Sequence, residues 1–260
     1  MTPTWEFTGD EFDALWTGID EEYLPAPFIH SGPRGDADEA EFARREALSR
    51  IKQRWGHELD EIVEVLVHPD IRVRVLGYGG GEKLTDPTCS VRMLAARKGE
   101  VGYLVRQLPG ETLYHAAGFV VTRHGALTLG DVIADHLPAA EAGRGQEIRL
   151  DEADDDQLDR SYGRSLVQHY DDDSAVQTQT FQQARLDRDG FIDVEQGWSR
   201  FGPRGIVRLR LGWRDLTDDG RYVIVPGTPP VAVGADRRRV VSLINSQIAE
   251  VVRAIRDDRA

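Results

Sequence analysis

Apolar residues recur at helical spacing over the first 68 residues. Thr8 and Glu11 have the spacing of a capping box, and the helix they begin carries an apolar stripe that starts at Phe12. A second amphipathic pattern ends near Gly56, and a third, shorter one ends before Pro69. The pattern therefore predicts helices, joined by loops rich in proline and glycine, for the first quarter of the chain.

The period changes to two at residue 70. Ile71, Val73 and Val75 alternate with arginines, which indicates a strand with one face in water. Short strands separated by turns follow as far as residue 121, so the pattern predicts an antiparallel meander. A helix over 127–138 then follows, with Asp131 as its predicted N-cap.

The same order of elements returns in the last third of the chain. After an acidic stretch at about 138–174, strands are expected over 190–227 and a long helix over 231–255. We interpret this as an internal repeat with halves at about 58–137 and 175–256 within a single domain, 1–260. The predicted fold class is α/β (α+β), with a central, mostly antiparallel twisted sheet, flanking helices and quasi-twofold symmetry.

Composition narrows the classes of function. A formal charge of −13 argues against non-specific binding to nucleic acid, and the apolar runs are far shorter than the roughly 20 residues of a membrane span. The single cysteine, Cys89, has no internal disulfide partner and is expected to be a buried structural thiol in a reducing cytoplasm. The start of the chain has no signal-peptide pattern. Three lysines against 29 arginines are typical of a GC-rich genome.

One stretch, "LDRDGFIDVEQGW" at 186–198, has some of the spacing of a calcium loop. With Gly190 in the sixth place, however, the first ligand position falls on Arg185 and the twelfth on Gln196. A cation and a neutral amide at these positions argue against calcium. The run is interpreted as a turn into a strand, with Phe191 and Trp198 available to the core.

Other motifs for chemistry are incomplete. "VLGYGGGE" at 75–82 ends in Glu82 where a dinucleotide loop needs glycine, so a hairpin loop is preferred. The seven histidines lack zinc-site spacing, and the acidic run that contains Asp154–Asp156 is expected to be a solvated face. No catalytic, cofactor-binding or metal-binding residue is predicted. An enzyme whose acid and base meet only in the fold is kept as a further hypothesis.

The last helix carries an apolar stripe wider than one narrow seam. Packing against the other closing helix explains most of it, and a helix-in-groove contact with a partner is the functional alternative. A self-associating scaffold protein that buries this stripe is the runner-up hypothesis for the whole chain. The residues concerned are Val240, Val241, Ile244, Ile248, Val251, Val252 and Ile255.

An ordered set of segments resembles one known family from about residue 5 to residue 256. These segments are "FTGDEFDALW", "HPDIRVRVLG", "SVRMLAARKGEVGYLVRQ", "PAAEAGRGQEIRL" and "LGWRDLTDDGRYVIV", followed by a helix after "VGAD". In this order they are similar to the EspG family, the chaperones associated with ESX (type VII) secretion in actinobacteria.

The resemblance implies a cytosolic, non-catalytic chaperone without a cofactor. Members of the family bind the exposed apolar tip of helical PE–PPE heterodimers, keep these clients soluble and direct them to secretion, and the free protein is expected to be able to form homo-oligomers. Carried onto this chain, the family's client contacts correspond to the loop at 77–87 and the helix at 236–255. The candidate residues are Tyr78, Gly79, Gly80, Gly81, Glu82, Lys83, Leu84, Val240, Ile244, Ile248, Val251 and Ile255.

Overall fold

The structure is a computed structural model that describes residues 2–19, 23–32, 36–150 and 169–259. Its strands are β1 (Thr4–Phe7), β2 (Ile71–Gly79), β3 (Val91–Lys98), β4 (Val101–Pro109), β5 (Ala116–Gly125), β6 (Ile148–Arg149), β7 (Leu186–Gln196), β8 (Arg208–Leu216), β9 (Gly220–Val225) and β10 (Val231–Gly234). Its α-helices are α1 (Gly9–Thr17), α2 (Ala37–Trp55), α3 (His57–Val67), α4 (Leu129–His136), α5 (His169–Gln183) and α6 (Arg237–Arg259). Short 3₁₀ helices η1 (Gly81–Thr85), η2 (Pro87–Cys89), η3 (Ala126–Thr128) and η4 (Gly202–Gly205) lie in the connections.

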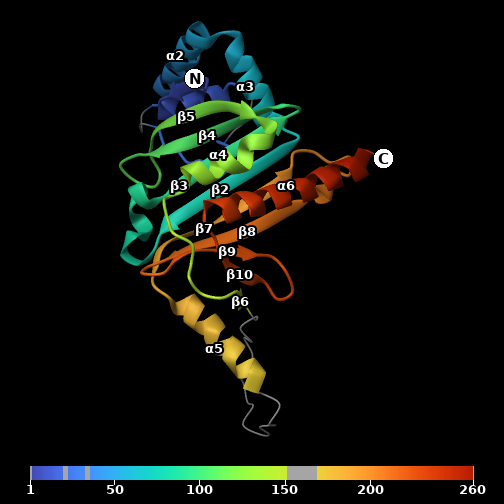
Figure 1. Cartoon of the computed structure of the whole chain (residues 1–260). Coiled ribbons are helices and arrows are strands. Elements are labelled where there is room, and N and C mark those ends of the chain that lie inside the picture. The colour runs from blue at the N-terminus through green and yellow to red at the C-terminus, as the bar shows by residue number, and fades with distance from the viewer. Residues whose placement is uncertain (1, 20–22, 33–35, 151–168, 260) are drawn as a thin grey trace.

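All these strands join one sheet in the order β1-β5-β4-β3-β2-β7-β8-β9-β10-β6 (Figure 1). Each pair of neighbours is antiparallel. The order has the same form on both sides of the central pair β2–β7: β1-β5-β4-β3-β2 from one edge corresponds to β6-β10-β9-β8-β7 from the other. On each side an edge strand and helical segments precede a four-strand meander, and a closing helix follows it. The predicted fold class, with its quasi-twofold repeat and C-terminal helix, is therefore present.

The two closing helices, α4 and α6, lie together on one face of the sheet. Their apolar sides cover the inward-facing residues of the central strands, and the predicted alternation of β2 is confirmed because Ile71, Val73 and Val75 are fully buried there. Each fully buried aliphatic side chain contributes about 1.5–3 kcal/mol relative to an exposed one. This core contains residues from both halves of the chain, including Ile133 of α4 and Ile244 of α6.

Among the described residues, helices cover the opposite face only towards the two edges of the sheet. Helices α1 and α3 pack over Leu94 of β3, Val105 of β4 and Phe119 of β5. At the far edge, Phe181 of α5 packs against Tyr222 of β9, with the two ring centroids 5.4 Å apart. Figure 1 shows α2 and α3 at one end of the sheet and α5 at the other.

The predicted start of α1 is confirmed in detail. Thr8 accepts a hydrogen bond from the backbone N–H of Glu11, and Glu11 accepts one from the backbone N–H of Thr8. The rings of Phe7 and Phe12, at the two staple positions, lie 5.7 Å apart. Local sequence alone therefore determines where this helix begins.

Among the local predictions that were wrong, two concern β7 and α4. Residues 186–196 form one continuous strand, β7, rather than a turn followed by a strand, because Gly190 pairs directly with Gly77 of β2. An added Cβ at Gly190 would lie 2.0 Å from the carbonyl oxygen of Leu76, so this glycine serves a close approach of two strands. Asp131 is not an N-cap: it lies in the first turn of α4, where it accepts a hydrogen bond from Arg237.

Residues 151–168, which include Asp154–Asp156, lie outside the described part of the chain. Within the described ranges, no helix combines the length and the apolar character needed to cross a bilayer.

Candidate functional site

The loop after β2 is the first region where the candidate residues gather. Tyr78 and Gly79 close β2, and Glu82, Lys83 and Leu84 lie in the 3₁₀ helix η1. All three η1 side chains are exposed, and Leu84 retains 55% of its accessible surface. An apolar side chain this exposed within a polar loop is a contact point available to a partner.

The glycines of this loop are required by close packing. A Cβ at Gly80 would lie 2.1 Å from the carbonyl oxygen of Leu186, and a Cβ at Gly79 would lie 2.4 Å from the carbonyl oxygen of Lys83. The N–H of Gly80 donates to the carbonyl of Asp187 at 2.9 Å, which ties the loop to the start of β7. Gly81 has φ of +55°, a conformation that favours glycine. Gly79 and Gly80 therefore allow close packing of the loop, and Gly81 allows the backbone to turn.

Asp86 holds the second part of the loop. Its carboxylate accepts hydrogen bonds from the backbone N–H and the hydroxyl of Thr88, at 2.9 Å and 2.6 Å. These two bonds lower the pKa of Asp86. Cys89 follows as a buried free thiol, as predicted. The loop thus presents Leu84 from a backbone that is held at both ends.

Helix α6 is the second candidate region, and its stripe faces inwards. Val240, Ile244, Ile248 and Val251 are buried against the sheet and α4, whereas Val241, Val252 and Ile255 are partly exposed. The outer face of α6 is mostly polar, with Asn245, Ser246, Glu250, Arg253 and Arg256 exposed. Most of the stripe that the scaffold hypothesis would bury between two copies is therefore already buried within one chain.

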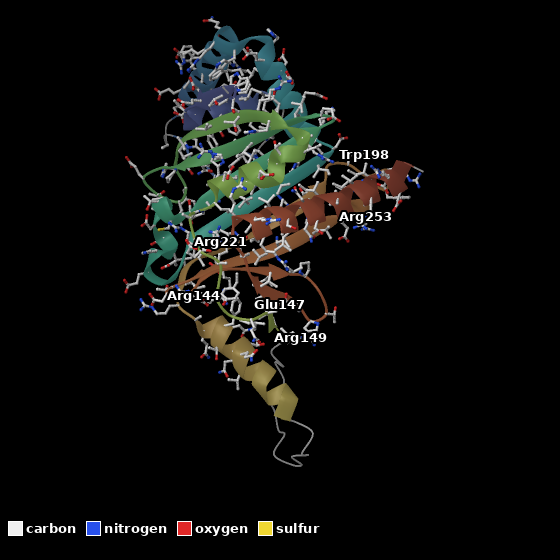
Figure 2. All side chains as sticks on the ribbon, viewed as in Figure 1. Arg144, Glu147, Arg149, Trp198, Arg221 and Arg253 are labelled. Carbon is white, nitrogen blue, oxygen red and sulfur yellow. The ribbon has the colours of Figure 1, made fainter. Side chains whose placement is uncertain are left out.

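A further exposed apolar pair lies in the loop after β7. Trp198 and Phe201 are 71% and 65% exposed, so the assignment of Trp198 to the core was wrong. Figure 2 shows Trp198 beside the C-terminal part of α6, near Arg253. Together with Ile255 and Asp258, Trp198 lines a cavity of about 150 Å³. Alternation could not have shown this, because it places Trp198 on the same face as buried Ile192 and Val194; the side chain is exposed because β7 ends at Gln196.

One larger cavity bears on the enzyme hypothesis. It has a volume of about 520 Å³ and lies between the end of α4, residues 138–141 and the start of α6. Its carboxylate Asp135 accepts a hydrogen bond from Arg237 at 2.5 Å, which lowers the pKa of Asp135. Arg221, another lining residue, forms a bidentate pair with buried Asp215. Both pairs are ion pairs that join elements, and neither has the matched acid and base of a catalytic site.

Comparison with known proteins agrees with this architecture. The model of the EspG family matches residues 8–246. Among solved structures, the chain is similar to the Mycobacterium tuberculosis type VII secretion system chaperone EspG5, which was solved in complex with a PE25–PPE41 dimer. The TM-score is 0.56 and the identity is 12%, over 94% of this chain and 95% of that one. At that identity the likeness shows a shared fold. No curated protein matches this chain.

Proposed function

The chain belongs to the EspG family, and from this premise we propose that it is a chaperone of a type VII (ESX) secretion system. It binds a PE–PPE-like helical heterodimer at the dimer's apolar tip, keeps this client soluble in the cytoplasm and directs it to secretion. It does so by binding and without catalysis. An apolar helical tip in water aggregates unless a partner covers it.

The observation that carries this proposal is the extent of the match. The family model spans 8–246, and the shared fold extends over 94% of the chain, so both halves of the sheet and both closing helices are included. The net charge of −13 suits a protein that must keep an apolar client in solution.

Within this proposal, the loop at 77–87 is the principal client contact. Leu84 supplies exposed apolar surface, Glu82 and Lys83 flank it, and the backbone behind them is tied to β7. Among the candidate residues of α6, only Ile255 is partly exposed; it lies near Gln196, at the opposite end of β2 from the loop, and offers a second, separate contact. Val240, Ile244, Ile248 and Val251 support α6 from below. Such a small, partly polar contact suits a client that must later be released.

Co-expression tests the function. The chain is produced with a PE–PPE-like pair encoded beside its gene, and the mixture is separated by size exclusion. We expect one complex that contains all three chains, and a client that precipitates when produced without the chaperone. Separate elution of the chain from every neighbouring pair would contradict the proposal.

A matched pair of variants tests the site. Leu84→Asp places a charge in the proposed contact, and Leu127→Asp makes the same change at η3, where Leu127 is 80% exposed. We expect Leu84→Asp to weaken client binding by roughly tenfold or more, the scale of a buried hot-spot side chain, and Leu127→Asp to leave it unchanged. Equal binding by the two variants would remove the loop from the interface.

A further inference from the structure

The sheet face opposite α4 and α6 carries cross-strand rows of arginine and carboxylate at its centre. One row joins Arg72 of β2, Glu195 of β7 and Arg208 of β8, because these residues are register partners. The next row joins Arg74, Asp193 and Arg210 in the same way. In both rows a carboxylate on the central strand lies between two arginines from the neighbouring strands.

The contacts within these rows are close. Arg210 binds Asp193 through Nε and Nη2 at 2.6 Å and 2.8 Å, and Arg208 Nε lies 2.7 Å from Glu195 Oε2. From the other side, Arg74 Nη2 lies 2.7 Å from Glu195 and 3.8 Å from Asp193. The arrangement is a continuous lattice rather than a set of separate pairs.

Exposure is divided unequally between the two kinds of charge. The side chains of Asp193 and Glu195 are only 2% and 5% exposed, whereas those of Arg208 and Arg210 are 57% and 59% exposed. A guanidinium has five N–H donors, and the described bonds to these carboxylates use one donor of Arg208 and two of Arg210. The surface that a partner meets is therefore guanidinium with donors to spare.

An apolar row follows the two charged ones. Leu76, Phe191, Gly212 and Ile224 are successive register partners across β2, β7, β8 and β9. The three side chains are partly exposed, and the guanidinium of Arg210 lies 4.1 Å from the centre of the Phe191 ring. Residues two apart on a strand are separated by about 6.6 Å, so this apolar row lies about that far from the Arg74 row.

The two charged rows contain more arginines than carboxylates. In these two rows four arginines face two carboxylates, so the face is basic in a chain whose net charge is −13. A negatively charged partner is repelled by most of the surface and attracted here. Arginine is the residue best suited to bind carboxylates in pairs.

We propose that this open face, made of Arg72, Arg74, Arg208, Arg210, Leu76, Phe191 and Ile224, is a docking surface for an acidic segment of a partner protein. The carboxylates of that segment bind the arginine rows, and an apolar side chain of the segment lies on the row at Phe191. The strands β2, β7 and β8 are paired on both sides, so recognition uses side chains alone. This surface adjoins the loop at 77–87, since Leu76 lies two residues before Tyr78 on the same face of β2, but it does not depend on the chaperone function.

Fluorescence anisotropy with a labelled peptide tests the surface. The probe is Asp-Glu-Asp-Phe-Glu-Asp-Glu, and the control probe replaces every acid by its amide. We expect saturable binding of the acidic probe that weakens with salt, and no binding of the amide probe. The ¹⁵N–¹H resonances of the Arg208 and Arg210 Nε groups are expected to shift during the titration.

A matched pair of double variants distinguishes the effect of net charge from the effect of the position of the arginines. Arg208→Gln/Arg210→Gln is compared with Arg45→Gln/Arg50→Gln on α2, whose side chains are also exposed and paired with glutamates. The net charge changes equally. We expect the first variant to lose roughly tenfold in affinity, as charge-assisted pairs imply, and the second to stay within about twofold of the parent.

If thermal unfolding shows that the glutamine variant does not fold, Arg208→Lys/Arg210→Lys takes its place, with Arg45→Lys/Arg50→Lys as its control. Lysine keeps the charge and removes the planar fork, so affinity is expected to fall in the first lysine variant only. Equal losses in both members of a pair, equal binding of the amide probe, or no saturable binding would overturn the proposal.

Discussion

At two glycines of this chain, the effect of a substitution depends on the neighbouring atoms more than on the residue type. Gly80 and Gly125 have nearly the same extended backbone, with φ, ψ of −81°, 153° and −72°, 146°. A Cβ at Gly80 would meet the carbonyl oxygen of Leu186 at 2.1 Å, whereas a Cβ at Gly125 would meet nothing within 4 Å. Because the backbone angles are nearly the same, a difference between substitutions at the two positions would come from steric fit.

We predict that Gly80→Ala destabilises the fold and that Gly125→Ala does not. The clash at Gly80 involves backbone, which must shift, and such overpacking costs about 1–3 kcal/mol. At Gly125 the added methyl restricts the unfolded chain and leaves stability equal or slightly higher. Urea unfolding of the two variants and the parent measures both effects. A Gly80→Ala variant as stable as Gly125→Ala would show that the loop is not tied to β7 as described.

His124 gives a pH dependence at the same scale. Burial lowers the pKa of His124, and the nearby charge of His136 lowers it further. A histidine with a lowered folded pKa is neutral in the native state while the unfolded chain already binds protons, so stability falls as the pH drops through about 6.5, the unfolded value, and levels off below the folded pKa. We expect His124→Gln to flatten this part of the profile. Urea unfolding at a series of pH values checks it, and an unchanged slope would contradict the assignment.

At the scale of elements, periodicity predicted the central strands and local motifs predicted helix starts. The alternation at 71–75 and the capping box at Thr8 are examples, because each depends on residues close in sequence. Strand β1 was missed because four residues carry too little pattern, and β10 because its apolar residues run into those of α6.

The candidate site was harder to predict than the fold. The loop at 77–87 was located through glycines and family resemblance, whereas the inward stripe of α6 resembled a contact surface in sequence alone. The arginine rows require the register of β7 between β2 and β8, and the pairing of β7 with β2 joins residues more than 100 positions apart. Such pairings depend on the whole sheet, so no local pattern contains them.

Two tryptophans, one in a loop and one in a strand, should differ in how much stability is lost when each is replaced. Trp198 in the loop after β7 is 71% exposed, and Trp213 in β8 is fully buried, with its ring above Gly77. We predict that Trp198→Phe shifts the fluorescence emission to shorter wavelength and changes stability by less than about 0.5 kcal/mol. Trp213→Phe should instead cost about 2 kcal/mol, because it leaves space in the core.

Emission spectra, iodide quenching and thermal unfolding of the two variants provide the measurement. Trp5 and Trp16 are also buried and Trp55 is partly buried, so Trp198, the most exposed of the five tryptophans, is expected to supply the largest share of the quenchable signal. Unchanged quenching in Trp198→Phe would mean that another protein surface covers this side chain in solution.

At the scale of the whole molecule, the quasi-twofold strand order raises the question whether the two halves unfold independently. We propose that the predicted repeat units extend to include an edge strand each, β1 in the first half and β6 in the second. The halves share the β2–β7 pairing and the core under α4 and α6. The first half also has its own core, which contains Leu94 and Val105.

The two cores cannot come apart easily, since β3 and β4 contribute residues to both. Met93 and Ala95 of β3 point into the shared core, whereas Leu94 and Ala96 between them point into the core under α1 and α3. Loss of either core therefore removes the packing on one side of β3 and β4. We predict a single cooperative unfolding transition for the whole chain, despite its repeat. Calorimetric and van't Hoff enthalpies should agree, and fluorescence and circular dichroism should report the same midpoint. Two separated transitions, one of them lost when Trp213 is replaced, would instead show that the repeat halves unfold as separate units.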